Sequence, residues 1–124
     1  MPASMTSRPQ AIHLQSGRVL ASRLEVPRTP LGLGLGLMFR SVFLSGHGML
    51  LRPCNGIHMM FVPFPIDAVF LDSGLRVKKV YPRLRAWWGT VWWVWGAQSV
   101  LELPAGAAQG LEVGDQITIT SPAA

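Results

Sequence analysis

The chain has 124 residues, enough for one domain with a hydrophobic core and too few for two. Hydrophobic residues make up 49% and charged residues 14%, a balance that argues against an intrinsically disordered chain. The formal net charge is +5, and a basic surface attracts anions without needing a specific site. Because the basic residues are spread out, with one local cluster at 76–85, we interpret them as a solvated face in preference to a nucleic-acid site.

The cysteine count and the hydropathy of the sequence indicate the cellular compartment. The single cysteine, Cys54, excludes an internal disulfide. The first twenty residues lack the apolar segment of a signal peptide. The longest apolar run, 31–39, is much shorter than the roughly 20 residues that cross a bilayer. We therefore expect a cytoplasmic protein.

The first predicted elements follow a loose tail, residues 1–10, that has no periodic pattern. Alternating apolar residues on both sides of a turn at 16–17 predict a β-hairpin or a pair of consecutive strands within 11–26. Thr29 and Pro30 are typical of a helix N-cap and of a first helical position, so a short helix is predicted there. The Leu-Gly repeat that follows weakens a helix and equally suits a strand, and we favour the helix.

Further short strands are predicted in the rest of the chain. The apolar runs concerned are 49–52, 57–62, 66–71, 75–81, 100–103 and 116–120. The turn residues at 72–74 predict a β-hairpin, and 105–111 has room for one helical turn. We predict a single mainly β domain over 11–120, a β-sandwich or small barrel with one or two short helices, and a frayed C-terminus at 121–124.

An ordered set of short motifs runs through the chain. They are Gly36-Leu37-Met38-Phe39-Arg40, Gly48-Met49-Leu50, Pro65-Ile66-Asp67, Phe70-Leu71-Asp72, Val77, Leu101-Glu102-Leu103-Pro104-Ala105-Gly106 and Gly114-Asp115. In this order and spacing the chain resembles domain-of-unknown-function family 192 (DUF192), a widespread prokaryotic family. The resemblance covers roughly 19–119 and implies a mainly β fold with a short helix at the Gly-Leu-Met segment. The family's activity is not settled, so the resemblance transfers no catalytic residue.

Two carboxylates lie inside apolar runs. Asp67 and Glu102 each have apolar neighbours on both sides. Strand alternation either places them on exposed faces or turns them into an interior shared with Arg40, and we favour structural pairing over a site. If the chain has a site, these three residues are the candidates, at the rim of a small apolar pocket. Acid–base work by Asp67 and Glu102 on a sugar or an ester is the enzymatic alternative.

Cys54 and His58 form a second candidate pair because they are four residues apart. On a helix this spacing would suit two metal ligands or a thiolate with its base, but Asn55-Gly56 interrupts a helix. One cysteine and three histidines are also a poor set for structural zinc. We favour a small buried Cys54 and a His58 whose ring bonds to a backbone carbonyl.

All five tryptophans lie in one segment, 86–96. They are Trp87, Trp88, Trp92, Trp93 and Trp95, and the basic cluster precedes them. Aromatic residues beside basic ones can bind single-stranded nucleic acid or a membrane surface, and Trp is also a heavy core residue. We predict that some of the five are exposed and form a partner or self-association surface.

These observations do not identify an activity. The interpretation we favour is a non-catalytic binding or accessory module with a small pocket and no cofactor. The alternatives are a hydrolase that uses Asp67 with Glu102 or Cys54 with His58, and a basic, Trp-rich surface for nucleic acid or lipid. The partner we expect is a small molecule or another protein, ahead of nucleic acid or a membrane.

Overall fold

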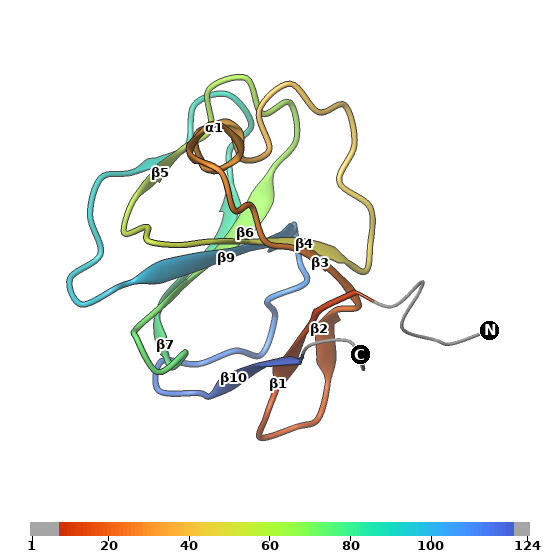
Figure 1. The fold of residues 1–124 in the computed structure, drawn as a ribbon, viewed down its shortest axis with the longest axis vertical. Helices are drawn as coiled ribbons and strands as arrows, with labels where there is room; N and C mark the ends of the chain where they lie inside the picture. The colour runs from red at the N-terminus through yellow and green to blue at the C-terminus, as the bar shows by residue number, and fades with distance from the viewer. Residues whose placement is uncertain (1–7, 121–124) are drawn as a thin grey trace.

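The apolar runs of the sequence form the strands of a five-stranded sheet at the centre of the computed structural model, which describes residues 8–120 (Figure 1). In spatial order its strands are β3 (Arg23–Glu25), β4 (His47–Leu51), β9 (Ser99–Pro104), β6 (Ile66–Leu71) and β7 (Val77–Leu84). β3 and β4 are parallel, and the other neighbouring strands are antiparallel. The predicted hairpin is confirmed, since β6 and β7 are joined by the turn at 72–74.

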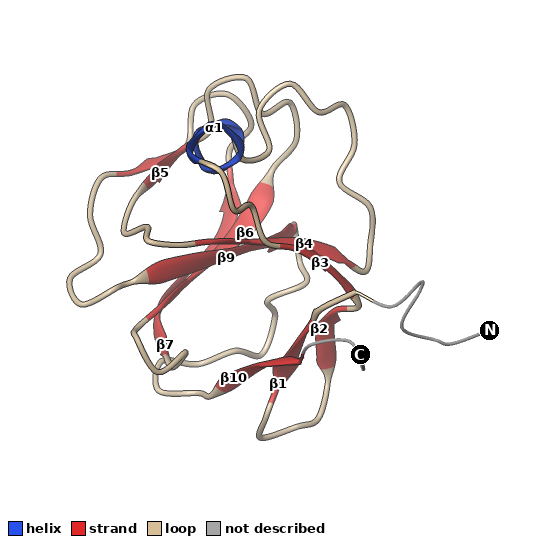
Figure 2. Cartoon of the chain, viewed as in Figure 1, coloured by secondary structure: helices blue, strands red, loops and turns tan. Residues whose placement is uncertain are grey.

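Two smaller sheets lie on opposite sides of the central sheet (Figure 2). A three-stranded sheet consists of β10 (Ile117–Thr120), β1 (Gln10–His13) and β2 (Val19–Ala21), all antiparallel. A two-stranded ribbon, β5 (Ile57–His58) with β8 (Thr90–Val91), lies on the other side together with helix α1 (Pro30–Leu35). The central sheet is therefore covered on both faces.

This double cover explains the composition of the central strands. Every residue of β6 is buried, and so is all of β9 except its last residue. Successive residues alternate between two hydrophobic cores. Val69 and Leu101 face the three-stranded sheet, whereas Phe70 and Val100 face α1. A strand buried on both faces is apolar without alternation, which is what these runs show.

The short helix begins as its residue types predict. Thr29 is the N-cap, its side chain accepts a hydrogen bond of 3.0 Å from the Gly32 amide, and Pro30 follows at the start of the helix. None of its residues is fully buried. Two glycines lie within α1 and a third, Gly36, is its C-cap, so the segment has a low intrinsic helix propensity. The helix is stabilised by its N-cap and by Leu33, which packs against the core.

Several details differ from the predictions. The apolar run before residue 27 is divided at Ser22 between β2 and β3, which belong to different sheets. β1 begins at Gln10, inside the predicted tail, and residues 105–111 form turns in place of a helical turn. Residues 1–7 and 121–124 lie outside the described part of the chain. The mainly β fold with a short helix, consistent with a sandwich, is confirmed.

Within residues 8–120, no helix has the length and apolar character needed to cross a bilayer.

Candidate functional site

A buried carboxylate that has no hydrogen-bond partner among residues 8–120 lies on the α1 side of the central sheet. Glu102 is only 5% exposed, and β9 holds it opposite Met49 of β4 and Ala68 of β6. No residue in the described part of the chain donates a hydrogen bond to its Oε1 oxygen. An unpaired buried carboxyl oxygen is expensive for a fold, so its retention needs an explanation.

Glu102 lines a cavity of about 120 Å³ beneath α1. The remaining wall is mostly apolar and comes from α1 and the segment after it, from β4, from Val62 and from the turn before β5. Its lining includes Leu33, Leu37, Leu51, Cys54, Ile57 and Val62. The glycines of the Leu-Gly repeat contribute backbone and no side chain to this wall, so the repeat leaves room beneath the helix.

Burial dominates the electrostatics of this carboxyl group. Loss of hydration raises the pKa of Glu102 to about 7, and the nearby Arg40 guanidinium opposes this rise. Near neutral pH the group is therefore divided between its neutral and its ionised forms. A carboxyl group in that state can donate a hydrogen bond, accept one, or attract a cation.

Arg40, the second predicted site residue, lies in a neighbouring cavity of about 360 Å³. Its guanidinium forms a two-point ion pair with Glu25 of β3, in which Nη2 lies 3.3 Å from Oε1. The two cavities share the wall formed by Leu35, Gly36 and Met38. Arg40 therefore acts on Glu102 through its charge and is paired directly with Glu25.

Asp67, the third candidate, lies on the opposite face of the sheet. β6 places it opposite Leu103, one position away from the pairing of Ala68 with Glu102. Its oxygens accept hydrogen bonds of 2.9, 3.0 and 2.9 Å from the backbone amides of Arg83, Gly106 and Ala108. Asp67 is fully satisfied by backbone and ties β7 to the turn after β9. The expectation of one interior shared by Asp67 and Glu102 is not met, and neither carboxylate is on an exposed face.

Cys54 and His58 both line the Glu102 cavity but do not bond to each other. The Cys54 thiol donates to the Gly56 carbonyl at 3.1 Å, and Nδ1 of His58 accepts from the Met60 amide at 3.2 Å. The predicted bond from His58 to a backbone carbonyl is wrong, because its ring accepts from a backbone amide. Burial, with a smaller contribution from Glu102, raises the pKa of the Cys54 thiol and keeps it protonated. Among the described residues, no three His, Cys, Asp or Glu side chains gather to hold a metal ion.

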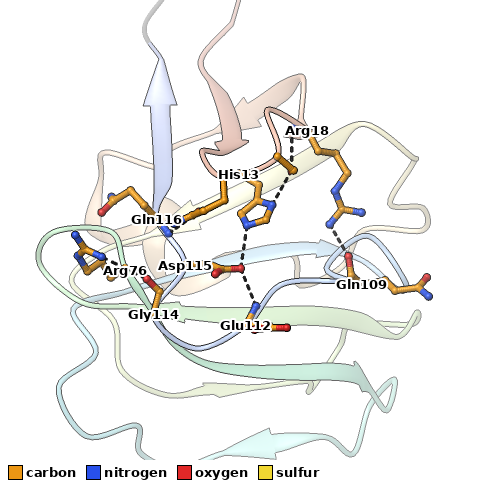
Figure 3. Close-up of polar contacts among 10 residues, drawn as sticks. His13, Arg18, Arg76, Gln109, Glu112, Gly114, Asp115 and Gln116 are labelled. Carbon is orange, nitrogen blue, oxygen red and sulfur yellow. Dashed lines mark hydrogen bonds and ion pairs between the residues drawn. The ribbon is translucent and has the colours of Figure 1, made fainter.

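A polar network that the sequence reasoning missed lies on the far side of the molecule (Figure 3). His13 is bonded through Nδ1 to Ser16 Oγ at 2.7 Å and through Nε2 to Asp115 Oδ2 at 2.9 Å. The connectivity is that of a serine nucleophile, a base and a carboxylate. However, Ser16 lies in an exposed turn three residues from His13, and its Oγ also accepts from the Arg18 amide. We interpret the network as a clamp that fastens the β1–β2 turn to the loop before β10.

The tryptophan segment, residues 86–96, lies on the surface of the protein. All five tryptophan residues are exposed, from 48% for Trp87 to 87% for Trp92. β8 ends at Val91, so the last three tryptophans lie in a loop. Trp93 and Trp95 are stacked there with their ring centres 6.1 Å apart.

Comparisons with known proteins agree with this fold. The model of DUF192, described as "Uncharacterized ACR", matches residues 11–119. A crystal structure of a protein of unknown function from Novosphingobium aromaticivorans DSM 12444 is similar, with a TM-score of 0.72 and 24% identity over 90% of this chain and 83% of that one. A protein from Sinorhizobium meliloti 1021, described as "a putative transcription regulator", has a TM-score of 0.69 and 24% identity over 91% and 92% of the two chains. At this identity the two structures support the fold alone. No curated protein matches the chain.

Proposed function

The chain belongs to the DUF192 family, and from the cavity beneath α1 we propose that it is a non-catalytic module that binds a small molecule against Glu102. The observation that carries this proposal is the Oε1 oxygen of Glu102, which has no partner within the described part of the chain, on a residue that is 5% exposed and lines a cavity. A bound molecule with a hydrogen-bond donor would satisfy that oxygen and remove the penalty.

The size and lining of the cavity limit the ligand. A volume of about 120 Å³ is somewhat below the roughly 150 Å³ of an engineered cavity that holds benzene. Leucine, isoleucine and valine side chains form most of the wall, and they favour an apolar body. We therefore propose a small, mainly apolar molecule with one donor group, of which a primary amine is the strongest candidate because it pairs with the carboxylate.

The geometry supports binding over hydrolysis. Asp67 and Glu102 are on opposite faces of the sheet, so they cannot act on one bond. Cys54 and His58 direct their hydrogen bonds to backbone groups, and the raised thiol pKa leaves no thiolate nucleophile. Neither pair has the mutual contact that acid–base or nucleophilic catalysis needs.

The test is a titration with small probes, followed by the shifts of backbone amide signals in NMR spectra. Isobutylamine, isobutanol and isovalerate have the same small branched body and differ in the group offered to Glu102. We expect the amine to shift the amides of Gly34, Gly36 and Gly56, and the carboxylate to shift none of them. Amine binding should also tighten as the pH rises through about 7, since the carboxylate forms there.

A matched pair of variants ties the binding to Glu102. Glu102→Gln should weaken amine binding roughly tenfold or more, because the ion pair is lost while the shape is kept. Glu112→Gln removes the same charge from an exposed loop and should leave binding unchanged. Amide shifts spread over the whole surface, or equal binding of the amine and the carboxylate, would contradict the proposal.

A further inference from the structure

Three loops at the α1 end of the molecule hold aromatic residues in a strained backbone conformation. Phe39, Phe61 and Trp87 have φ angles of 66°, 61° and 68°. This left-handed region is unfavourable for residues with a bulky side chain, and such strain is concentrated at functional sites. The three residues are far apart in sequence, so their common conformation is a feature of this end of the fold.

The strained residues also touch. The Phe39 amide donates to the Phe61 carbonyl at 2.8 Å, and the Trp87 amide donates to the Val62 carbonyl at 3.1 Å. The ring centres of Phe39 and Phe61 are 4.9 Å apart, and those of Phe61 and Trp87 are 5.7 Å apart. Despite these contacts the residues Phe39, Phe61 and Trp87 remain 68%, 41% and 48% exposed. The fold thus holds a row of aromatic rings in solvent.

Two neighbouring side chains enlarge the row to an aromatic patch. The patch consists of Phe39, Met60, Phe61, Trp87 and Trp88, and the last four line a shallow hollow of about 250 Å³. Met60 is 55% exposed and Trp88 is 78% exposed. Contiguous exposed apolar surface of this kind marks an interaction site.

The stretches of chain that hold the patch carry charge of one sign, and Arg85 is a cation at the base of one of its turns. The patch residues lie within 26–66 and 73–101, stretches that also include α1 and four strands, and neither stretch contains an aspartate or a glutamate. These stretches carry eight of the eleven Lys and Arg residues, namely Arg28, Arg40, Arg52, Arg76, Lys78, Lys79, Arg83 and Arg85. Arg40 is the only one of the eight that forms a salt bridge among the described residues. Arg85 lies at the base of the turn that holds Trp87 and Trp88, since its carbonyl accepts from the Gly89 amide at 2.9 Å.

Exposed aromatic residues with unpaired cations fit an anionic lipid surface or a nucleic acid. A base needs a free ring face on which to stack. Here the ring faces are partly occupied by one another, in the patch and in the stacked pair of Trp93 and Trp95. A lipid interface needs only the apolar body of such rings, with cations beside them. The arrangement therefore favours lipid.

We propose that this end of the protein docks on an anionic membrane surface, with the aromatic patch at the level of the headgroups and Arg85 beside lipid phosphates. The docking does not depend on a ligand in the Glu102 cavity. Each cation near the surface and each buried ring strengthens the attachment.

The experiment is flotation of the full chain with vesicles of phosphatidylcholine, alone or mixed with phosphatidylglycerol. We expect flotation with the mixed vesicles only, a loss of binding as salt is added, and a shift of tryptophan fluorescence to shorter wavelength. Absence of flotation, or equal flotation with both compositions, would overturn the proposal. So would tighter binding of a single-stranded oligonucleotide than of vesicles, or a stable dimer that is lost when the patch is altered.

Two matched pairs of variants locate the docking surface. Met60→Ser/Trp88→Ser should lower vesicle binding roughly tenfold, whereas Leu14→Ser/Val113→Ser, at exposed sites beyond the three-stranded sheet, should lower it by less than about twofold. Arg85→Glu should lower binding roughly tenfold, and Arg76→Glu, with the same net charge but beside Gly114, should have the smaller effect. Equal effects within either pair would reject this surface.

Discussion

The two buried carboxylates of the central sheet have opposite environments. Asp67 and Glu102 are one pairing position apart on adjacent strands, 1% and 5% exposed, and face opposite cores. Three backbone amides satisfy Asp67, whereas Oε1 of Glu102 has no donor among the described residues and lines a cavity. A buried carboxylate whose oxygens all accept hydrogen bonds stabilises the fold. A buried carboxylate with an oxygen that accepts none is available to a ligand.

The largest loss of stability is expected from Asp67→Ala. The substitution leaves three amides in and around the turn after β9 without their acceptor, so the free energy of unfolding should fall by about 3–5 kcal/mol in a urea titration. Asp67→Asn keeps one acceptor oxygen and should lose less. A loss below about 1 kcal/mol for the alanine variant would mean that the carboxylate is not the structural member of the pair.

Glu102→Gln should behave differently, with an effect that depends on pH. The carboxyl group titrates at about 7 in the folded protein against 4.5 for an ordinary glutamate, so the unfolded chain loses its proton first. The stability of the parent protein should therefore fall as the pH rises from 4.5 to about 7. At 1.36 kcal/mol per pKa unit, Glu102→Gln should be more stable than the parent by up to about 3 kcal/mol at high pH and similar to it at low pH.

The measurement is the difference in unfolding free energy between parent and variant across that pH range. Glu112→Gln, at an exposed position, supplies the control and should give a curve parallel to the parent. If the Glu102→Gln curve were parallel as well, the carboxyl group would be solvated and the comparison with Asp67 would fail.

Gly56 tests how tightly the cavity wall is built. A methyl group added there would lie 2.6 Å from the Trp92 carbonyl oxygen and 2.8 Å from that of Val91, so Gly56→Ala must push the β8 end away. We expect a loss of about 2 kcal/mol in thermal unfolding, together with displaced amide signals around the cavity. Gly34→Ala meets no atom within 4 Å and should instead stabilise α1 by about 0.5–1 kcal/mol. Equal effects of the two alanines would contradict the packed wall.

The smallest effect is expected at the clamp on the other side of the sheet. His13→Ala removes the bonds to Ser16 and Asp115 and should lower the free energy of unfolding by about 1 kcal/mol. Faster amide hydrogen exchange should be confined to β1, β2 and β10. Leu14→Ala, at the exposed neighbouring position, is the control. Exchange that rises throughout the protein would show that the clamp is not local.

Part of the fold could be predicted because local chemistry decides it. The Thr29-Pro30 pair predicts the helix start, since a capping side chain and a fixed φ act within one turn. The turn at 72–74 predicts the β6–β7 hairpin for the same reason. The division at Ser22 could not be predicted, because the order of strands in separate sheets depends on contacts distant in sequence.

The candidate site shows more clearly what could not be predicted from the sequence. The residue types and apolar neighbours of Asp67 and Glu102 predict two unusual carboxylates, and Arg40 does act on one of them through its charge. The alternation of apolar and polar residues could not predict which face each carboxylate occupies, because it distinguishes the two faces of a strand only when one of them is exposed to solvent. In a sheet covered on both sides the two faces are equally apolar.

By itself the sequence determined the class of this protein: a mainly β domain of the DUF192 family, with a capped helix and an excess of positive charge. Only the tertiary structure decided that Asp67 is satisfied, that Glu102 is left open to a cavity, and that the rings of Phe39, Phe61 and Trp87 meet in solvent. The physical reason is the distance along the chain over which each interaction acts. Caps, turns and composition act between neighbours, whereas hydrogen-bond satisfaction and surface patches arise where distant segments pack together.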